Sequence, residues 1–171
     1  MNNKNHIPHV FDLETTHNHL IITVGEVRVL LDTGSPYSFR MQGGPDRLVL
    51  GGREIPLLPM PVRAAAMHQG MELLGTSFEV LLGMDAMKSW TWDISWEAGK
   101  VRVTPSGATE SFGTWLPLEP SLGKWDGSCP SFRAEGGRSR VLLDTGAELS
   151  YVVGSIPPTA AEVDSSQDYN P

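Results

Sequence analysis

Short apolar runs separated by glycine-rich turns recur along the chain, and this pattern predicts strands. The stretch "HLIITVGEVRVLLDTG" has aliphatic and β-branched residues at 20–24 and, apart from Arg28, at 27–31, on either side of a Gly-Glu pair, as expected for a tight hairpin. "RLVLGGREIPL" repeats the arrangement around Gly51-Gly52. These patterns favour an all-β fold.

The next apolar run leads into a different combination of elements. "SFEVLLGMDAMKSW" predicts a strand over residues 77–82 that ends at Gly83, followed by a short helix over 85–89. "TWDISWEAGKVRVTP" then predicts a hairpin, whose alternation puts Trp92, Ile94 and Trp96 on one face. Residues 10–108 therefore make a first complete lobe.

A second, shorter unit follows a change in composition. "PSGATESFG" (105–113) is rich in glycine, serine and threonine and is typical of a linker. Residues 114–171 form the second unit, which ends in a polar, proline-rich and acidic stretch, "PPTAAEVDSSQDYNP", expected to be a flexible tail.

The second unit repeats the first at an offset of 112 residues. Val-Leu-Leu-Asp-Thr-Gly occupies 29–34 and again 141–146, and Ser38 matches Ser150. In both copies a predicted strand ends at the aspartate. The length of the match indicates an internal duplication rather than two chance tripeptides.

The two aspartates, Asp32 and Asp144, suggest a shared-proton site. When two carboxyl groups lie together in a partly dehydrated site, ionising both of them is energetically costly, so the pair holds one proton between them. Such a pair can accept a proton from water with one oxygen and donate a proton with another, which is general acid–base hydrolysis. The alternative is that each aspartate only caps a turn.

"LLDTGSPYSF" followed by "EVLLGMDAM" resembles the aspartic protease superfamily, particularly its retropepsin-like branch. The resemblance implies a retropepsin/pepsin-like acid protease fold, with a closed β-barrel lobe and a ψ-shaped loop beneath each catalytic aspartate. It implies an aspartic endopeptidase that acts on peptides or proteins without a metal or organic cofactor. The residues it singles out are the catalytic Asp32 and Asp144; the loop residues Thr33, Gly34, Ser35, Thr145, Gly146 and Ala147; and the ψ-loop support Leu81, Leu82, Gly83 and Asp85.

The second lobe departs from this pattern, which leaves two alternatives open. By the offset of 112, its counterpart of Leu81-Leu82-Gly83 falls near position 195, whereas the sequence ends at Pro171, so the second lobe is expected to be partial. One alternative is a non-catalytic retropepsin-like module used for binding or dimerisation. The other is a homodimeric protease in which Asp32 residues from two chains meet.

The substrate-covering flap of the family has no clear counterpart. "LVLGGREIPL", with Gly51-Gly52 at its tip, is either a short flap or an ordinary structural hairpin, and the structural interpretation is preferred.

Composition narrows the function classes. A net charge of −7 disfavours nucleic acid and anionic membranes as partners. The single cysteine, Cys129, excludes an internal disulfide. No secretory signal or membrane-spanning run is visible, so the expected location is the cytoplasm. His17 and His19 lack acidic or cysteine partners at suitable spacing, so we expect a solvated polar strand there rather than a metal site.

Overall fold

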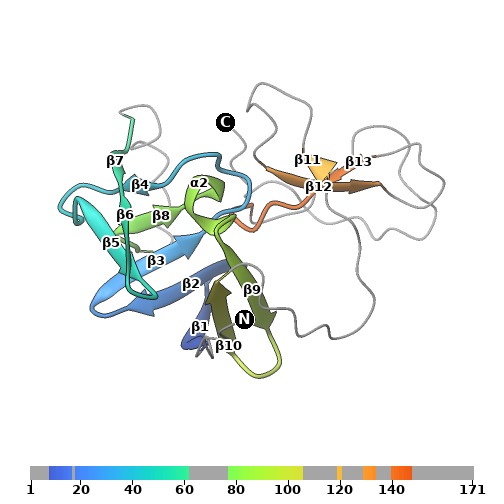
Figure 1. Cartoon of the computed structure of the whole chain (residues 1–171), viewed down its shortest axis with the longest axis horizontal. Coiled ribbons are helices and arrows are strands. Elements are labelled where there is room, and N and C mark those ends of the chain that lie inside the picture. The colour runs from blue at the N-terminus through green and yellow to red at the C-terminus, as the bar shows by residue number, and fades with distance from the viewer. Residues whose placement is uncertain are drawn as a thin grey trace, which may run out of the picture.

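The computed structural model describes residues 8–16, 18–61, 77–105, 119–120, 129–133 and 140–147, and these are mostly β-strand (Figure 1). The predicted all-β class is confirmed at this level. The strands and helix are β1 His9–Thr16, β2 His19–Val24, β3 Val27–Leu31, β4 Phe39–Arg40, β5 Arg47–Leu50, β6 Arg53–Pro56, β7 Leu58–Pro59, β8 Val80–Leu82, α2 Met84–Met87, β9 Trp90–Ser95, β10 Lys100–Pro105, β11 Glu119–Pro120, β12 Pro130–Arg133 and β13 Arg140–Leu142.

The largest sheet has the order β7-β4-β8-β3-β2-β1-β10-β9. β8 lies between β3 and β4, which follow one another in the chain, and it is parallel to β3 but antiparallel to β4. The strand predicted at 77–82 therefore does pass beside the segment that ends at Asp32, although it is shorter than predicted. Among the described residues β7 and β9 do not pair with each other, so the closed barrel stays a prediction.

The hairpin β2–β3 forms as its sequence predicts. Val24 pairs with Val27 across a two-residue turn in which Gly25 has a φ of 66°, a conformation that glycine adopts without steric cost. Both faces of the hairpin are covered: Val29 and Leu31 belong to the main core, and Ile21 and Leu30 to a smaller cluster on the other side. Burial on both faces explains the uninterrupted apolar runs.

At the start of the chain one strand was not predicted and one prediction is wrong. β1 was not predicted, yet it pairs with both β2 and β10. Phe11 and Leu13 pack against the main core but are only partly buried, and the exposed Asp12 lies between them, which is a weak signal in a single sequence. His19 is buried at 7% exposure rather than solvated, because β2 is enclosed on both sides.

The end of the first lobe follows the predicted order with shifted boundaries. The helix α2 covers four residues, directly after Gly83, and β9 and β10 form the predicted hairpin. Trp92 and Ile94 pack against the main core. Trp96 is 62% exposed, so its predicted place on the same face is wrong: β9 ends at Ser95 and Trp96 begins the turn.

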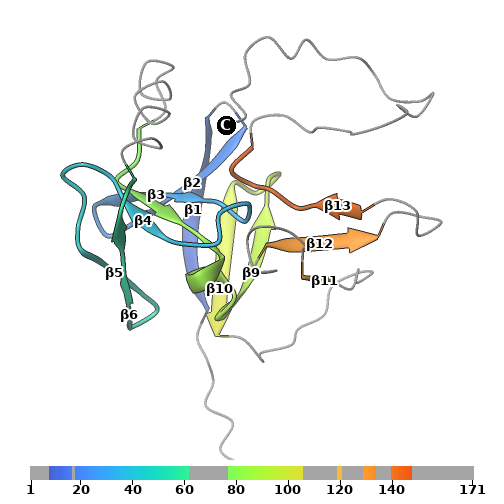
Figure 2. The same cartoon turned by 90° about the horizontal axis from the view of Figure 1, so that it is seen from above.

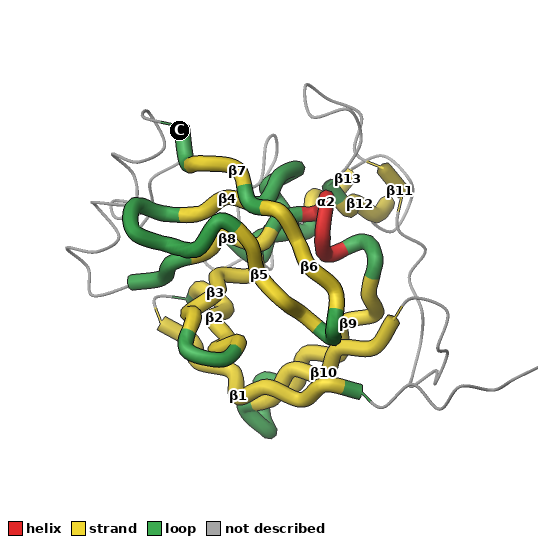
Figure 3. The backbone as a smooth tube through the Cα atoms, turned by 60° about the vertical axis from the view of Figure 1, so that its left-hand side comes forward, coloured by secondary structure: helices red, strands yellow, loops and turns green. Residues whose placement is uncertain are grey.

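The hairpin β5–β6 is a packing element of the first lobe, as the structural interpretation predicts. Leu48, Leu50 and Ile55 are buried in the main core. Figure 3 shows the turn between β5 and β6 close to β9. At that turn a Cβ added to Gly51 would lie 2.6 Å from the ring of Trp90, and the Arg53 guanidinium stands 5.1 Å from the ring centroid.

We expect Gly51→Ala to destabilise the protein more than Gly52→Ala. Both glycines have positive φ, 56° and 76°, so both substitutions carry a backbone cost of about 1 kcal/mol. Only Gly51 is also packed against a ring, while nothing lies within 4 Å of a Cβ on Gly52. Because of the added steric overlap, Gly51→Ala should lower the free energy of unfolding by about 2 kcal/mol or more. Urea unfolding of both variants measures the difference, and equal losses would contradict the ring contact.

A second, three-stranded sheet has the order β11-β12-β13. It lies on the opposite side of the large sheet from β5 and β6 in both Figure 1 and Figure 2. By the internal repeat, β13 is the counterpart of β3. The predicted linker beyond Pro105, the predicted tail and His17 lie outside the described residues. Within the described ranges, no helix has the length and apolar character needed to cross a membrane.

Candidate functional site

The two repeated aspartates face each other in the structure. Asp32 directly follows β3, and Asp144 follows β13 after one residue. A Cβ added to Gly34 would lie 2.3 Å from the carboxylate carbon of Asp144, and a Cβ on Gly146 would lie 2.4 Å from that of Asp32. Each carboxylate therefore rests against the glycine of the opposite loop. Figure 1 shows the segment after β13 running back toward the large sheet.

The requirement for glycine at these two positions is spatial. Neither Gly34 nor Gly146 has a positive φ, so the loops do not need glycine for its backbone freedom. Any side chain there would occupy the place of the facing carboxylate. The close approach of the opposite loop is therefore the reason for glycine at both positions.

The threonines of the two loops are joined by reciprocal hydrogen bonds. The Thr33 N–H donates to Thr145 Oγ1 at 3.0 Å, and the Thr145 N–H donates to Thr33 Oγ1 at 3.0 Å. Each hydroxyl then donates across to the other strand, Thr33 Oγ1 to the Leu143 carbonyl at 2.6 Å and Thr145 Oγ1 to the Leu31 carbonyl at 2.7 Å. Four hydrogen bonds thus hold the Asp32 and Asp144 loops together.

Each aspartate is oriented by amides of its own loop. Asp32 Oδ1 accepts from the N–H groups of Gly34 and Ser35 at 2.9 and 3.0 Å. Asp144 Oδ1 accepts from Gly146 and Ala147 at 2.9 and 3.2 Å. The same oxygen is fixed in both loops. This near-symmetry is what the repeated sequence would produce if both loops adopt one conformation.

The two carboxyl groups differ in environment. Asp32 is half-buried, whereas Asp144 is exposed. Burial, followed by the nearby charge of Asp144, raises the pKa of Asp32 to about 7, and the amide hydrogen bonds from Gly34 and Ser35 oppose part of this effect. Below neutral pH, Asp32 is therefore the member of the pair that holds a proton.

The Asp32 loop is supported from below by β8 and the start of α2. The Asp32 N–H donates to the Leu82 carbonyl at 3.0 Å, and the Met84 N–H donates to the Ser35 carbonyl at 2.9 Å. Leu81 and Leu82 pair with Leu30 and Leu31 of β3. The loop and the β8–α2 junction therefore cross at Gly83, where an added Cβ would lie 2.2 Å from the Tyr37 carbonyl oxygen.

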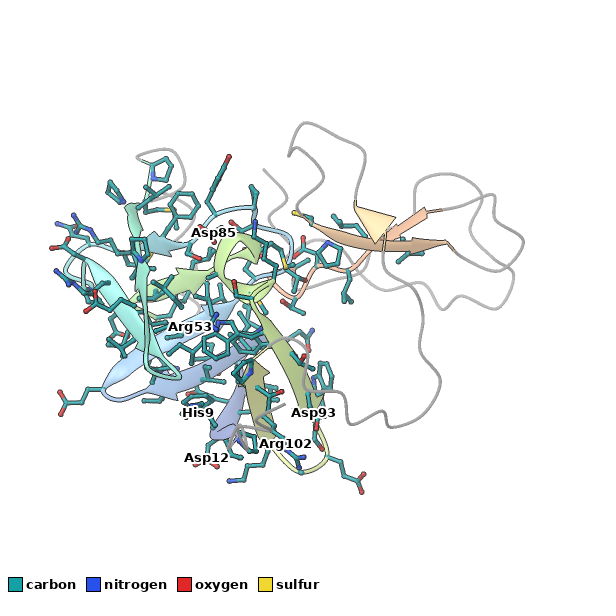
Figure 4. The ribbon with its side chains drawn as sticks, in the orientation of Figure 1. His9, Asp12, Arg53, Asp85, Asp93 and Arg102 are labelled. Carbon is teal, nitrogen blue, oxygen red and sulfur yellow. The ribbon has the colours of Figure 1, made fainter. Side chains whose placement is uncertain are left out.

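A hydrogen-bond network at this crossing includes Ser38, which the sequence analysis did not assign to the site. Ser38, fully buried, accepts a hydrogen bond from the Gly83 N–H at 3.0 Å and donates one to Asp85 Oδ1 at 2.6 Å. Its match with Ser150 in the repeat was the available signal. Asp85, labelled in Figure 4, lies in the first turn of α2, whose N-cap is Gly83.

Cys129 also contacts the site, and no motif around it indicates this contact. Its buried thiol donates to the Gly34 carbonyl at 3.1 Å. Cys129 immediately precedes β12, so this contact links the small sheet directly to the Asp32 loop. Within the described part of the chain, no cluster of three or more His, Cys, Asp or Glu side chains could hold a metal ion.

Comparisons with protein-family models, with curated proteins and with solved structures find no match to this chain.

Proposed function

We propose that this protein is an aspartic endopeptidase that hydrolyses peptide bonds with a water activated by Asp32 and Asp144. The observation that carries the proposal is the interlocking of the two Asp-Thr-Gly loops. Two carboxyl groups are held face to face, with one oxygen of each fixed by amides and the other free of those bonds. A turn-capping role would account for the amide bonds but not for this facing arrangement.

The electrostatic asymmetry supports a division of roles. Asp32, with its raised pKa, supplies a proton to the carbonyl oxygen of the substrate as the tetrahedral intermediate forms. Asp144, the exposed member of the pair, accepts a proton from the attacking water. The proton on Asp144 then passes to the leaving amine, the C–N bond breaks, and a hydroxyl of the intermediate returns its proton to Asp32 as the carboxylic acid forms, so that the pair again holds one proton. Protons balance without a covalent intermediate.

Topology supports a retropepsin/pepsin-like fold for the same proposal. β8 lies between β3 and β4 beneath the Asp32 loop, which matches the ψ-shaped loop expected from the resemblance. The pairs β2–β3 and β12–β13 repeat the hairpin that precedes each aspartate. Asp144 of the same chain already stands opposite Asp32, which favours an intramolecular pair over a homodimer built from two Asp32 residues.

The pH dependence of activity tests the proposal. Catalysis requires a protonated Asp32 beside an ionised partner, so we expect the rate to be high at mildly acidic pH and to fall as pH rises through about 7, where Asp32 loses its proton. Cleavage of an unfolded protein substrate between about pH 4 and pH 9, measured on chain purified free of host proteases, gives the profile. A rate that rises through pH 7 would contradict the assignment of Asp32 as the acid.

A further inference from the structure

The Asp32 loop rests on β8 and α2 through contacts on both sides of Gly83. The Leu82 carbonyl, just before Gly83, accepts from the Asp32 N–H at 3.0 Å. The Met84 N–H, just after it, donates to the Ser35 carbonyl at 2.9 Å. The N–H of Ser35 in turn donates to Asp32 Oδ1 at 3.0 Å. A short path of hydrogen bonds therefore links the backbone position at Gly83 to the carboxyl group of Asp32.

The hydroxyl of Ser38 holds the backbone at Gly83. Ser38 is 0% exposed, and its Oγ accepts from the Gly83 N–H at 3.0 Å. A buried N–H that loses its acceptor is costly, so removal of the hydroxyl favours a shift of the Gly83 backbone toward another partner. The loop packs closely against Gly83, since an added Cβ would lie 2.2 Å from the Tyr37 carbonyl oxygen and 2.9 Å from that of Ser35. Such a shift would therefore move the loop as well.

Asp85 orients the Ser38 hydroxyl. Ser38 Oγ donates to Asp85 Oδ1 at 2.6 Å. Because a hydroxyl has a single proton, this bond leaves the oxygen lone pairs for the Gly83 N–H. Asp85 is fixed in its turn: its N–H donates to the Pro36 carbonyl at 3.1 Å, and its Oδ1 accepts from the Ala86 N–H at 2.8 Å. The hydroxyl is thus held from both sides, by α2 and by the end of β8.

We propose that Ser38 is a positioning residue for the Asp32 carboxyl group, acting through the Gly83 backbone with its hydroxyl oriented by Asp85. The inference rests on the proposed peptidase function, because the orientation of Asp32 affects a reaction only if Asp32 takes part in it. Ser38 is buried beneath the loop, so it acts on the carboxyl group through the backbone and not by contact with a substrate. A merely structural serine would stabilise the fold without changing the ionisation of Asp32.

Loosening the loop changes the ionisation of Asp32 in one direction. Burial and then the nearby charge of Asp144 raise the pKa of Asp32 to about 7, and the N–H groups of Gly34 and Ser35 lower it in part. A longer bond from the Ser35 N–H removes some of that lowering, because an amide donor stabilises the charged carboxylate. The pKa of Asp32 should therefore rise when the Ser38 hydroxyl is removed.

The other groups near the loop stay in place in this comparison. Asp144 is the charged side chain whose carboxylate faces the Asp32 loop among the described residues, and the Cys129 thiol bonds the loop at the Gly34 carbonyl. The charge of Asp85 does not contribute to the raised pKa of Asp32, so substitutions of Asp85 act on Asp32 through hydrogen bonds.

Ser38→Ala in the full chain is the first test. Titration of the Asp32 carboxyl carbon by NMR, assigned with Asp32→Asn, should show its pKa raised by at least about 0.5. On an unfolded protein substrate, kcat should fall at least about 10-fold while KM changes less than about 2-fold, because the carboxyl group is misoriented but Ser38 does not meet the substrate. The fall of the rate at high pH should move upward with the pKa.

Three further variants separate positioning from general stability. Leu48→Ala removes buried apolar contacts of the main core on β5 and should destabilise the fold without changing the pKa of Asp32 or kcat. Asp85→Asn keeps an oxygen that can accept from Ser38, so it should stay close to the wild type. Asp85→Ala lacks that acceptor and should raise the pKa of Asp32, and it carries the test if Ser38→Ala does not fold.

The inference would be overturned by an unchanged pKa of Asp32 in Ser38→Ala, by an equal change in Leu48→Ala, or by a raised KM at unchanged kcat. An Asp85→Asn variant that behaves like Asp85→Ala would also overturn it, because charge would then replace the hydrogen bond as the cause. A wild-type chain that cleaves no substrate would refute the proposed function alone. The NMR titration then decides the positioning of Asp32 by itself, and a raised pKa in Ser38→Ala would retain it.

Discussion

Asp32→Asn is expected to abolish peptidase activity and, at alkaline pH, to make the protein more stable. An amide can neither donate the catalytic proton nor return to the charged state, so the rate should fall at least about 1,000-fold. The amide oxygen of asparagine can still accept the hydrogen bonds from Gly34 and Ser35, so the loop should keep its shape.

The stability effect has a defined sign. The pKa of Asp32 is about 7 in the folded protein, against about 4 for an unfolded aspartate. Between these values the folded state holds a proton that the unfolded state has lost, so wild-type stability is complete below about pH 4 and declines as pH rises through 7. The Asp32→Asn variant has no ionisable group at this position, so its stability does not decline in this way. Urea unfolding should show a gain on the order of 1 kcal/mol at pH 8 and none at pH 4.

Asp93→Asn is the matched control, because Asp93 is exposed on β9, 3.9 Å from Arg102. It should change neither activity nor the pH dependence of stability. Asp144→Asn should remove activity as fully as Asp32→Asn, whereas a homodimer built on two Asp32 residues would tolerate it. Peptidase activity retained in Asp32→Asn would refute the mechanism, and an unchanged stability profile would refute the raised pKa.

Thr33→Val should cause the largest loss of stability among single changes at the site. Valine keeps the shape of threonine but removes the hydroxyl that accepts from the Thr145 N–H and donates to the Leu143 carbonyl. The Thr145 N–H and the Leu143 carbonyl would then lack these hydrogen bonds in a partly buried position, which should lower the free energy of unfolding by about 2–4 kcal/mol. Thr145→Val should cost a similar amount, since it removes the reciprocal pair of bonds.

The double variant Thr33→Val/Thr145→Val should lose less than the sum of the single changes. Once one hydroxyl is gone, the loops can separate and water can reach the remaining groups, so the second change removes less. Thr33→Ser should recover most of the stability, and Thr23→Val, at an exposed position on β2, should have little effect. Urea unfolding followed by tryptophan fluorescence measures all five variants. Simple additivity would show that the four bonds do not act as a unit.

The local sequence pattern was sufficient to predict the structure where two segments that follow one another in the chain pair with each other. The hairpins β2–β3, β5–β6 and β9–β10 each join two apolar runs through a short turn, and positive-φ glycines at 25, 51, 52 and 99 permit those turns. The repeat likewise identified both aspartates as a related pair, because a duplicated sequence tends to repeat its local conformation. It could not show that the two loops face each other.

Tertiary contacts decided what the local pattern left open. β1 is a strand because β2 and β10 flank it, although its own sequence has few apolar positions. Ser38 accepts a hydrogen bond from Gly83, 45 residues away, and Cys129 donates one to Gly34, 95 residues away, and such separations leave no periodic signal. The same Val-Leu-Leu is buried in β3 and exposed at β13. The sequence by itself determined the three hairpins and the repeated pair of aspartates, whereas the strand β1, the burial of individual side chains and the pKa of Asp32 depend on neighbours that only the folded chain supplies.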